Sequence, residues 1–276
     1  MKRIICLIDF SETSLNALEF ATNLCQNLKS ELTLAYIFTE TEFNKIINRD
    51  EIGDLSSLKD EALEKMKAIA SGIDKTRKQS GLSPIKCVIE SGQFNEKVLD
   101  LISSQQADLI VMGTDGAGNI IESWLGSSST QIVELSDVPV LIVPFTAQFS
   151  SLNSIVFASN FDEEELASLD QLTEIADSCN SALTVLHLYR NGHQPNLELE
   201  EKMKAKIGNS KANLISRHYD GDMTLAIDHY MNENDSDLLA LVKTERNFIE
   251  RLFNPGLTRR MTYLVKYPLL VFKANN

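Results

Sequence analysis

The chain contains two copies of one unit. Residues 3–10 (RIICLIDF) align with residues 154–161 (SIVFASNF) at an offset of 151, and residues 32–37 align with residues 183–188 at the same offset. Later the offset falls to 129, as three matched pairs indicate: Gly92 with Gly221, Asp108 with Asp237, and Pro139 with Pro268. The second copy is thus 22 residues shorter in the middle of the unit. Such self-similarity predicts two tandem domains, at residues 1–146 and 152–274.

Strand and helix patterns alternate within the first copy. Continuously apolar segments predict strands at residues 4–8, 31–38, 84–89, 109–112 and 140–143. Apolar residues at helical spacing predict helices between them, at residues 14–27, 55–73, 96–104 and 130–135. This alternation indicates an α/β fold in which two tandem doubly wound domains each have a parallel sheet flanked by helices. Such sheets bind ligands at the carboxyl ends of the strands, where the strand order reverses.

Charge and cysteine content exclude several classes of protein. The chain has 26 Lys and Arg against 39 Asp and Glu, a net charge of −13, and both halves are acidic. We therefore expect no binding to nucleic acid or to an anionic membrane through bulk positive charge. The four cysteines are too widely spaced for a zinc site or a disulfide framework. No apolar stretch approaches the roughly 20 residues of a membrane span, so we expect a cytoplasmic protein.

A glycine-spaced loop follows the fourth predicted strand. It contains Gly113, Gly116 and Gly126 and ends in three serines, Ser127, Ser128 and Ser129. Glycine allows tight turns and lets backbone amides approach an anion without a Cβ in the way. The serines open the next helix, whose first amides are unpaired and carry the positive end of the helix dipole. The loop is therefore suited to hold a phosphate without a lysine. The alternative is that its glycines only allow the turns of a loop that binds no ligand.

These residues resemble the universal stress protein family. Its nucleotide-binding signature, G-x2-G-x9-G-[ST] after the fourth strand, is matched without adjustment by Gly113, Gly116, Gly126 and Ser127. The turn at residues 9–13 and the segment at residues 136–143 also resemble the family pattern. The likeness covers residues 1–145 and, more weakly, residues 152–274.

The resemblance implies a sheet of five parallel strands in the order 3-2-1-4-5 in each copy. It also implies ATP, accompanied by Mg²⁺ or Mn²⁺, at the switch point between strands 1 and 4 of the first copy. The implied contacts are Asp9 at the nucleoside end, Ile37 at the adenine edge, Met112 and Gly113 at the ribose, and Gly116, Gly126, Ser127, Ser128 and Ser129 at the phosphates. From the residues alone, the alternative for Asp9 is to cap a helix or to close a turn.

Asp115 departs from the family pattern, which commonly has a basic residue or His at this position. A carboxylate about 4 Å from a phosphate costs roughly 1 kcal/mol in water and several at an effective dielectric constant near 20. Three interpretations stay open: Asp115 faces solvent, helps to hold a divalent metal, or weakens ATP binding.

The second copy lacks the glycine loop. Val242, Glu245, Pro255 and Gly256 occupy the positions of Gly113, Gly116, Gly126 and Ser127, and Asn160 replaces Asp9. Val242 adds a β-branched side chain and Pro255 removes an amide donor, so we expect the second copy to keep the fold without binding ATP through this loop. The basic residues of this region form a solvated face or meet an anionic partner: Lys243, Arg246, Arg251, Arg259 and Arg260.

The histidines do not indicate a metal site. All four lie in the second copy: His187, His193, His218 and His229. His187 falls on a predicted strand, which favours a core role. Three aspartates near His218 show no recognised ligand spacing.

The favoured function is regulatory: ATP held by the first copy changes the shape or the partners of the chain during stress. One alternative is a slow ATPase or phosphoryl transferase, but the sequence has no G-K-[ST] lysine and no evident base, so we assign no catalytic residues. Another is an interaction module independent of nucleotide. Family members pair through their last strands, here residues 140–143 and 269–272. We expect this pairing to occur within the chain as a pseudo-dimer, with a homodimer left open.

Overall fold

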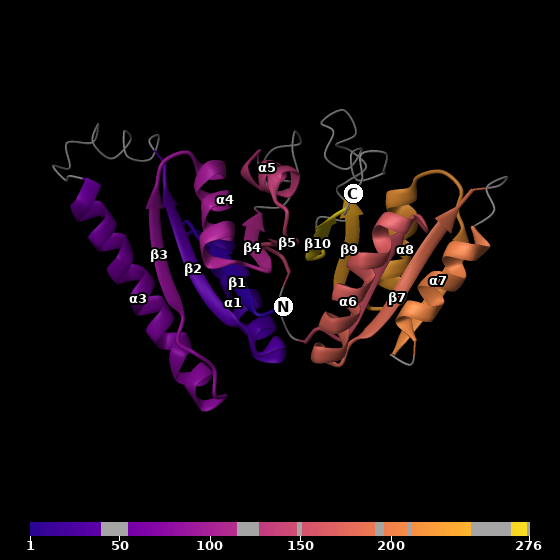
Figure 1. Cartoon of the computed structure of the whole chain (residues 1–276), viewed down its shortest axis with the longest axis horizontal. Helices are drawn as coiled ribbons and strands as arrows, with labels where there is room; N and C mark the ends of the chain where they lie inside the picture. Colours follow the sequence, from indigo (N-terminus) through magenta and orange to yellow (C-terminus); the bar gives the residue numbers. More distant parts are fainter. Residues whose placement is uncertain are drawn as a thin grey trace.

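The computed structural model describes residues 1–39, 55–114, 127–147, 151–190, 196–208, 211–243 and 266–274. These residues contain ten strands, which form one sheet in the order β3-β2-β1-β4-β5-β10-β9-β6-β7-β8 (Figure 1). Helices cover both faces of this sheet. The predicted doubly wound α/β fold is thereby confirmed.

The N-terminal half, residues 1–147, contributes five parallel strands. They are β1 (Arg3–Leu7), β2 (Glu31–Phe38), β3 (Lys86–Ser91), β4 (Leu109–Thr114) and β5 (Val140–Pro144). Its helices are α1 (Glu12–Leu28), α3 (Leu55–Gln79), α4 (Phe94–Gln105) and α5 (Ser127–Leu135). The strand order is the expected 3-2-1-4-5. β3 begins two residues after the expected position, because Pro84 has no N–H to donate and the ladder with β2 starts at Lys86.

The C-terminal half, residues 151–274, repeats this plan. Its strands are β6 (Ser154–Ser159), β7 (Ala182–Tyr189), β8 (Ala212–His218), β9 (Leu238–Lys243) and β10 (Leu269–Lys273). Its helices are α6 (Leu166–Cys179), which follows the 3-10 helix η2 (Glu163–Glu165), then α7 (Leu197–Ile207) and α8 (Met223–Glu233). α3 has 25 residues where α7 has 11, which accounts for much of the length difference between the copies.

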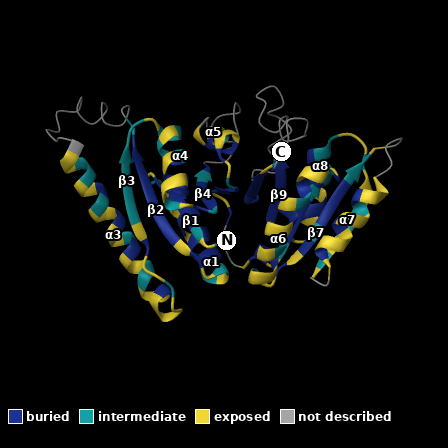
Figure 2. Cartoon of the chain, viewed as in Figure 1, coloured by how far each residue is buried: buried dark blue, intermediate teal, exposed yellow. Residues whose placement is uncertain are grey.

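Two apolar layers enclose the sheet. Alternate residues of β1 point to opposite layers: Ile4 and Cys6 belong to the apolar layer that also contains residues of α1, α3, α6 and α7, whereas Ile5 and Leu7 belong to the layer that contains residues of α4, α5 and α8. Figure 2 shows the central strands buried and the outer faces of the helices exposed. Burial on both faces explains why the strands are continuously apolar in sequence.

The repeat extends to the backbone conformation. Among the described residues, six non-glycine residues have positive φ, and they form three equivalent pairs: Phe10 and Phe161, Lys29 and Asn180, and Gln106 and Asp235. Positive φ is uncommon outside glycine, so its recurrence at matched positions shows that the two halves share the same turns.

The halves meet through their last strands, as expected. β5 and β10 pair antiparallel, with Leu141 opposite Leu270, Val140 opposite Val271 and Ile142 opposite Leu269. Leu141 and Leu270 are equivalent residues of the repeat, so the register is that of an approximate two-fold axis. Two ion pairs also join the halves: Lys273 Nζ lies 2.6 Å from Asp137 Oδ1, and the terminal amine of Met1 lies 2.9 Å from Glu174 Oε1.

Leu270→Asp tests the energetic importance of this junction. Leu270 is 2% exposed, so a carboxylate there would be buried against Leu141, and we expect the free energy of unfolding to fall by about 3 kcal/mol or more in urea denaturation. Leu197→Asp is the matched control, because Leu197 is 70% exposed and begins α7, where an acid is favourable. It should change stability by less than about 0.5 kcal/mol. Equal losses in the two variants would contradict a core role for the junction.

Candidate functional site

The strand order of the N-terminal half reverses between β1 and β4. β1 lies between β2 and β4, with Leu7 opposite Ala35 and Cys6 opposite Val111. Residues 8–9, which follow β1, therefore lie beside residues 36–38 and 112–114, the carboxyl ends of β2 and β4, along one edge of the sheet. The structure thus brings Asp9 and Gly113 to adjacent strand ends, with Met112 and Ile37 beside them and buried. This edge is where doubly wound proteins bind their ligands.

Asp9 closes the turn between β1 and α1. Its Oδ1 accepts hydrogen bonds from the backbone N–H of Ser11 at 3.0 Å and from the Ser11 hydroxyl at 2.5 Å. Partial burial acts to raise the pKa of Asp9, but hydrogen bonds from Ser11 and Ser14 outweigh it and hold the pKa below its ordinary value. Ser11, not Asp9, caps α1 by accepting from Ser14 N. Of the two structural roles open to Asp9, helix capping and closing a turn, the structure shows that Asp9 closes the turn.

Gly113 allows a close contact between β4 and α1. A Cβ at this position would lie 2.7 Å from the carbonyl oxygen of Thr13 and 2.8 Å from its Cγ2, closer than Cβ atoms approach other atoms. Gly113 therefore has a packing role in addition to the ligand contact that the family resemblance implies. The first turn of α1 lies directly against the end of β4 because position 113 has no side chain.

α5 begins at Ser127, and its first turn contains no acidic residue. Ser128 is exposed and Ser129 is buried. Two expected phosphate contacts, Gly116 and Gly126, lie outside the described residues, as does Asp115. Of the predicted contacts, the structure therefore describes Asp9, Ile37, Met112 and Gly113, together with the start of the helix that follows the glycine loop.

The corresponding edge of the C-terminal half is built differently. Here η2 precedes α6, whereas α1 begins three positions earlier in the repeat, at Glu12. Val242, the equivalent of Gly113, is 2% exposed. The later start of the α-helix and the presence of Val242 are consistent with each other. In the N-terminal half, Thr13 fills the space beside Gly113, whereas the C-terminal half has a side chain at that strand position.

Glu165 is a buried carboxyl that no sequence pattern predicts. It occupies the position of Ser14 and is 1% exposed. Its Oε1 accepts a hydrogen bond from Asn160 N at 3.1 Å, and its Oε2 bonds to the Ser159 hydroxyl. Burial raises the pKa of this carboxyl from 4.5 to about 7, despite these hydrogen bonds. In the N-terminal half, the equivalent Ser14 Oγ accepts a hydrogen bond from Asp9 N at 3.3 Å. Ser14 and Glu165 therefore bind equivalent backbone amides of the two halves.

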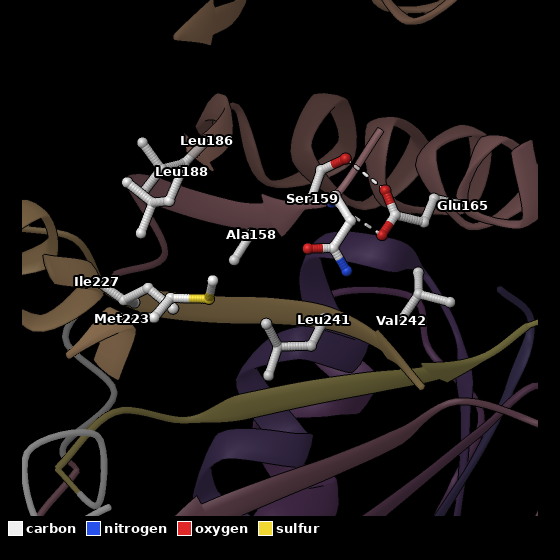
Figure 3. A pocket seen from close by; sticks show the side chains of 10 residues that line it. Ala158, Ser159, Glu165, Leu186, Leu188, Met223, Ile227, Leu241 and Val242 are labelled. Atoms are coloured by element: carbon white, nitrogen blue, oxygen red, sulfur yellow. Dashed lines mark hydrogen bonds between the residues drawn. The ribbon is translucent and has the colours of Figure 1, made fainter. Parts of the chain in front are cut away.

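A pocket opens beside Glu165 at the carboxyl ends of β6 and β9 (Figure 3). Its cavity volume is about 20 Å³, room for roughly one water molecule. Its lining comprises Ala158, Ser159, Asn160, Glu165, Leu186, Leu188, Met223, Ile227, Leu241 and Val242. The pocket therefore lies at the switch point of the C-terminal half, in the copy that lacks the glycine loop.

His187 has the core role that the sequence favours. Its ring stacks on Phe161 with centroids 4.1 Å apart, and its Nδ1 lies 3.0 Å from the carbonyl oxygen of Ser159. Burial lowers the pKa of His187. Within the described parts of the chain, no three His, Cys, Asp or Glu residues are grouped as metal ligands. His193 and the arginines at positions 246, 251, 259 and 260 lie outside those parts, and Lys243 ends β9.

The strand order and the helices on both faces define a doubly wound α/β protein. A family model, "Universal stress protein family", matches residues 1–144. The chain belongs to the universal stress protein family, which has a stress-response role. In the described parts of the chain, no helix combines the length and apolar character needed to cross a membrane.

Individual relatives support this assignment. Universal stress protein MJ0577 of Methanocaldococcus jannaschii is 27% identical over 153 residues, which cover 51% of this chain and 94% of that protein. Universal stress protein YxiE of Bacillus subtilis is 24% identical over 146 residues, covering 51% and 97%. A universal stress protein structure from Archaeoglobus fulgidus matches 99% of this chain and 98% of its own, with a TM-score of 0.74 and 17% identity. That structural likeness shows the fold of both halves.

Gly113→Ala tests the contact between β4 and α1. The added methyl group would overlap Thr13, so we expect a loss of about 1–3 kcal/mol in the free energy of unfolding. Gly72→Ala is the control, because no atom lies within 4 Å of a Cβ at that position in α3. There alanine should stabilise by up to about 1 kcal/mol. Denaturant titration of both variants separates the effects, and a Gly113→Ala protein as stable as wild type would contradict the contact.

Glu165→Gln tests the buried carboxyl. Because the folded-state pKa is raised to about 7, folded protein keeps a proton that unfolded protein loses. The stability due to Glu165 should therefore be full below about pH 4.5 and fall by roughly 3 kcal/mol as the pH rises to about 7.5. Glu165→Gln should lack this part of the pH dependence, whereas Glu164→Gln, an exposed neighbour, should retain it. Identical pH profiles for wild type and Glu165→Gln, measured by chemical denaturation, would show that Glu165 is not perturbed.

Proposed function

We propose that this chain is a regulatory ATP-binding protein in which the N-terminal half holds the nucleotide. The observation that carries the proposal is the register of β1 with β4, which brings Asp9 and Gly113 to one edge at the switch point. The glycine signature continues from that edge to α5 in the sequence. The first turn of α5 has no acidic residue to repel an anion.

The residues at this edge fit a nucleoside and its phosphates. Asp9 stays ionised because hydrogen bonds keep its pKa low, and an ionised carboxylate is suited to accept hydrogen bonds from sugar hydroxyls. The backbone of Ile37 would meet the adenine edge, and Met112 and Gly113 would border the ribose. Gly116, Gly126, Ser127, Ser128 and Ser129 would hold the phosphates, and Mg²⁺ or Mn²⁺ would neutralise part of their charge.

The C-terminal half would not bind ATP in this way. Val242 supplies a buried side chain where Gly113 has none, and Asn160 lacks the charge of Asp9. We propose that this half serves the N-terminal half as its sheet partner in a pseudo-dimer. Occupancy of one site would then act on a two-domain body and change which partners it binds.

Isothermal titration of the full chain with Mg-ATP tests the proposal. We expect one ATP per chain, and an affinity at least about tenfold lower for Gly116→Val, which places a β-branched side chain in the signature. Gly72→Val is the matched control, since position 72 is exposed and remote from the edge. Two ATP molecules per chain, or equal affinities for the two variants, would contradict the assignment.

Phosphate release under the same conditions tests the enzymatic alternative. A regulatory binder should release phosphate slowly or not at all. Turnover that disappears in Gly116→Val would instead assign an ATPase to the same site.

A further inference from the structure

The chain leaves the N-terminal half through a β-turn at residues 144–147, which we call the linker turn. Ala147 N closes it by donating to Pro144 O at 3.0 Å. Asn16, in the second turn of α1, holds it from outside: its Nδ2 donates to the carbonyl oxygens of Pro144 at 2.9 Å and Ala147 at 2.8 Å. An amide nitrogen has two hydrogens to donate, so this one side chain fastens both ends of the linker turn to α1.

This use of Asn16 is particular to the N-terminal half. At the repeat offset of 151, the position of Asn16 is occupied in α6 by Ala167, whose methyl group cannot donate a hydrogen bond. The fold that the two halves share therefore does not require this donor. Its partner is instead the segment through which the N-terminal half is joined to the C-terminal half.

The start of α1 also borders the proposed nucleotide site. The backbone of Thr13 lies so close to Gly113 that a Cβ there would be 2.7 Å from the Thr13 carbonyl oxygen. One residue later, Ser14 Oγ accepts a hydrogen bond from Asp9 N at 3.3 Å. Hydrogen bonds between residues four apart join successive helical turns into one rigid element. The position of Asn16 is therefore fixed together with that of the residues that contact Asp9 and Gly113.

The linker turn also contacts the start of the glycine loop. Thr114, the last residue of β4, lies opposite Pro144 in the sheet. Its carbonyl oxygen accepts a hydrogen bond from Phe145 N at 3.2 Å. The linker turn is thus held from two sides, by α1 and by the residue that follows Gly113, and both of these border the proposed nucleotide site.

The other end of the linker is fastened to the C-terminal half. Asn153, the last residue before β6, donates from its backbone N to Asp237 Oδ2 at 2.6 Å. Its carbonyl oxygen accepts a hydrogen bond from Ala182 N, the first residue of β7, at 2.7 Å. The described ends of the linker therefore connect the proposed nucleotide site to the strands of the C-terminal half.

We propose that Asn16 is a positioning residue that couples nucleotide binding to the linker; this inference rests on the nucleotide site proposed above. Nucleotide at the strand ends fixes the start of α1 and the start of the glycine loop. Asn16 and Thr114 then hold the linker turn more firmly, and without nucleotide the turn opens more often. Because coupling between two binding equilibria is reciprocal, a linker turn that cannot be held weakens nucleotide binding by the same factor.

Hydrogen exchange of the full chain, resolved at single amides by NMR with and without saturating Mg-ATP, tests the coupling. The amides of Phe145 and Ala147 are both hydrogen-bonded in the linker turn. We therefore expect Mg-ATP to slow their exchange at least about fivefold. The amide of Gly208, which bonds to Lys204 O at the end of α7, is the internal reference and should exchange at the same rate in both samples.

Asn16→Leu removes the donor with little change in side-chain size and no change in charge. It should bind Mg-ATP at least about fivefold more weakly than wild type and lose the ATP-dependent protection of Phe145 and Ala147. Asn23→Leu is the matched control, because it makes the same change on the same helix two turns beyond Asn16. This control should match wild type in both measurements.

The outcomes separate this inference from the proposed ATP site. The coupling is overturned, and the site left intact, if wild type binds ATP without protecting the two amides. It is equally overturned if Asn16→Leu keeps either the affinity or the protection of wild type. A chain that binds no ATP in the titration overturns the site and the coupling together. The exchange measurement on wild type decides the matter even where the Asn16→Leu chain does not fold.

Discussion

The antiparallel pairing of β5 with β10 is the interaction on which the rest of the structure depends. Apart from the exposed Lys273 at the end of β10, both strands are apolar and buried. Either of them at the edge of a separate sheet would expose apolar side chains and unpaired backbone groups. The register centred on Leu141 and Leu270 satisfies both edges at once. The outer strands that remain, β3 and β8, are much less buried. The two halves are therefore parts of one sheet, and neither can lose its fold without exposing the last strand of the other.

Because of this dependence, the C-terminal half must keep its fold, whereas the residues at its strand ends are free to differ. The half must supply β10 and the layers that bury it, which constrains the core and the turns with positive φ at Phe161 and Asn180. The pairing places no such constraint on the carboxyl ends of β6 and β9. There the start of α6 differs from that of α1, and Val242 and Glu165 occupy positions that carry Gly113 and Ser14 in the N-terminal half. A copy without the glycine loop thus retains a structural role.

Much of this architecture can be predicted from the sequence, because burial on both faces leaves apolar runs and the repeat supplies a second set of them. The start of β3 was predicted two residues early, since apolarity alone does not show where a ladder begins. Arg77 and Glu165 could not be predicted. Arg77 is fully buried and donates to the carbonyl oxygens of Ser30 and Ser83, and Glu165 lies in an acidic run that is typical of solvated surface. Their burial follows from tertiary contacts that no local pattern records. The only available signal for Glu165 was its alignment with Ser14, which faces the end of a strand.

The equivalent edges of the two halves each carry a carboxyl group, and the surroundings give these groups opposite properties. Hydrogen bonds from Ser11 lower the pKa of Asp9, although partial burial acts to raise it. This carboxylate is therefore a hydrogen-bond acceptor at neutral pH. Burial dominates at Glu165 and raises its pKa to about 7, so its charge is costly in this environment. Divergence of the two copies at one helix start is therefore sufficient to give equivalent strand ends two carboxyl groups of opposite electrostatic character.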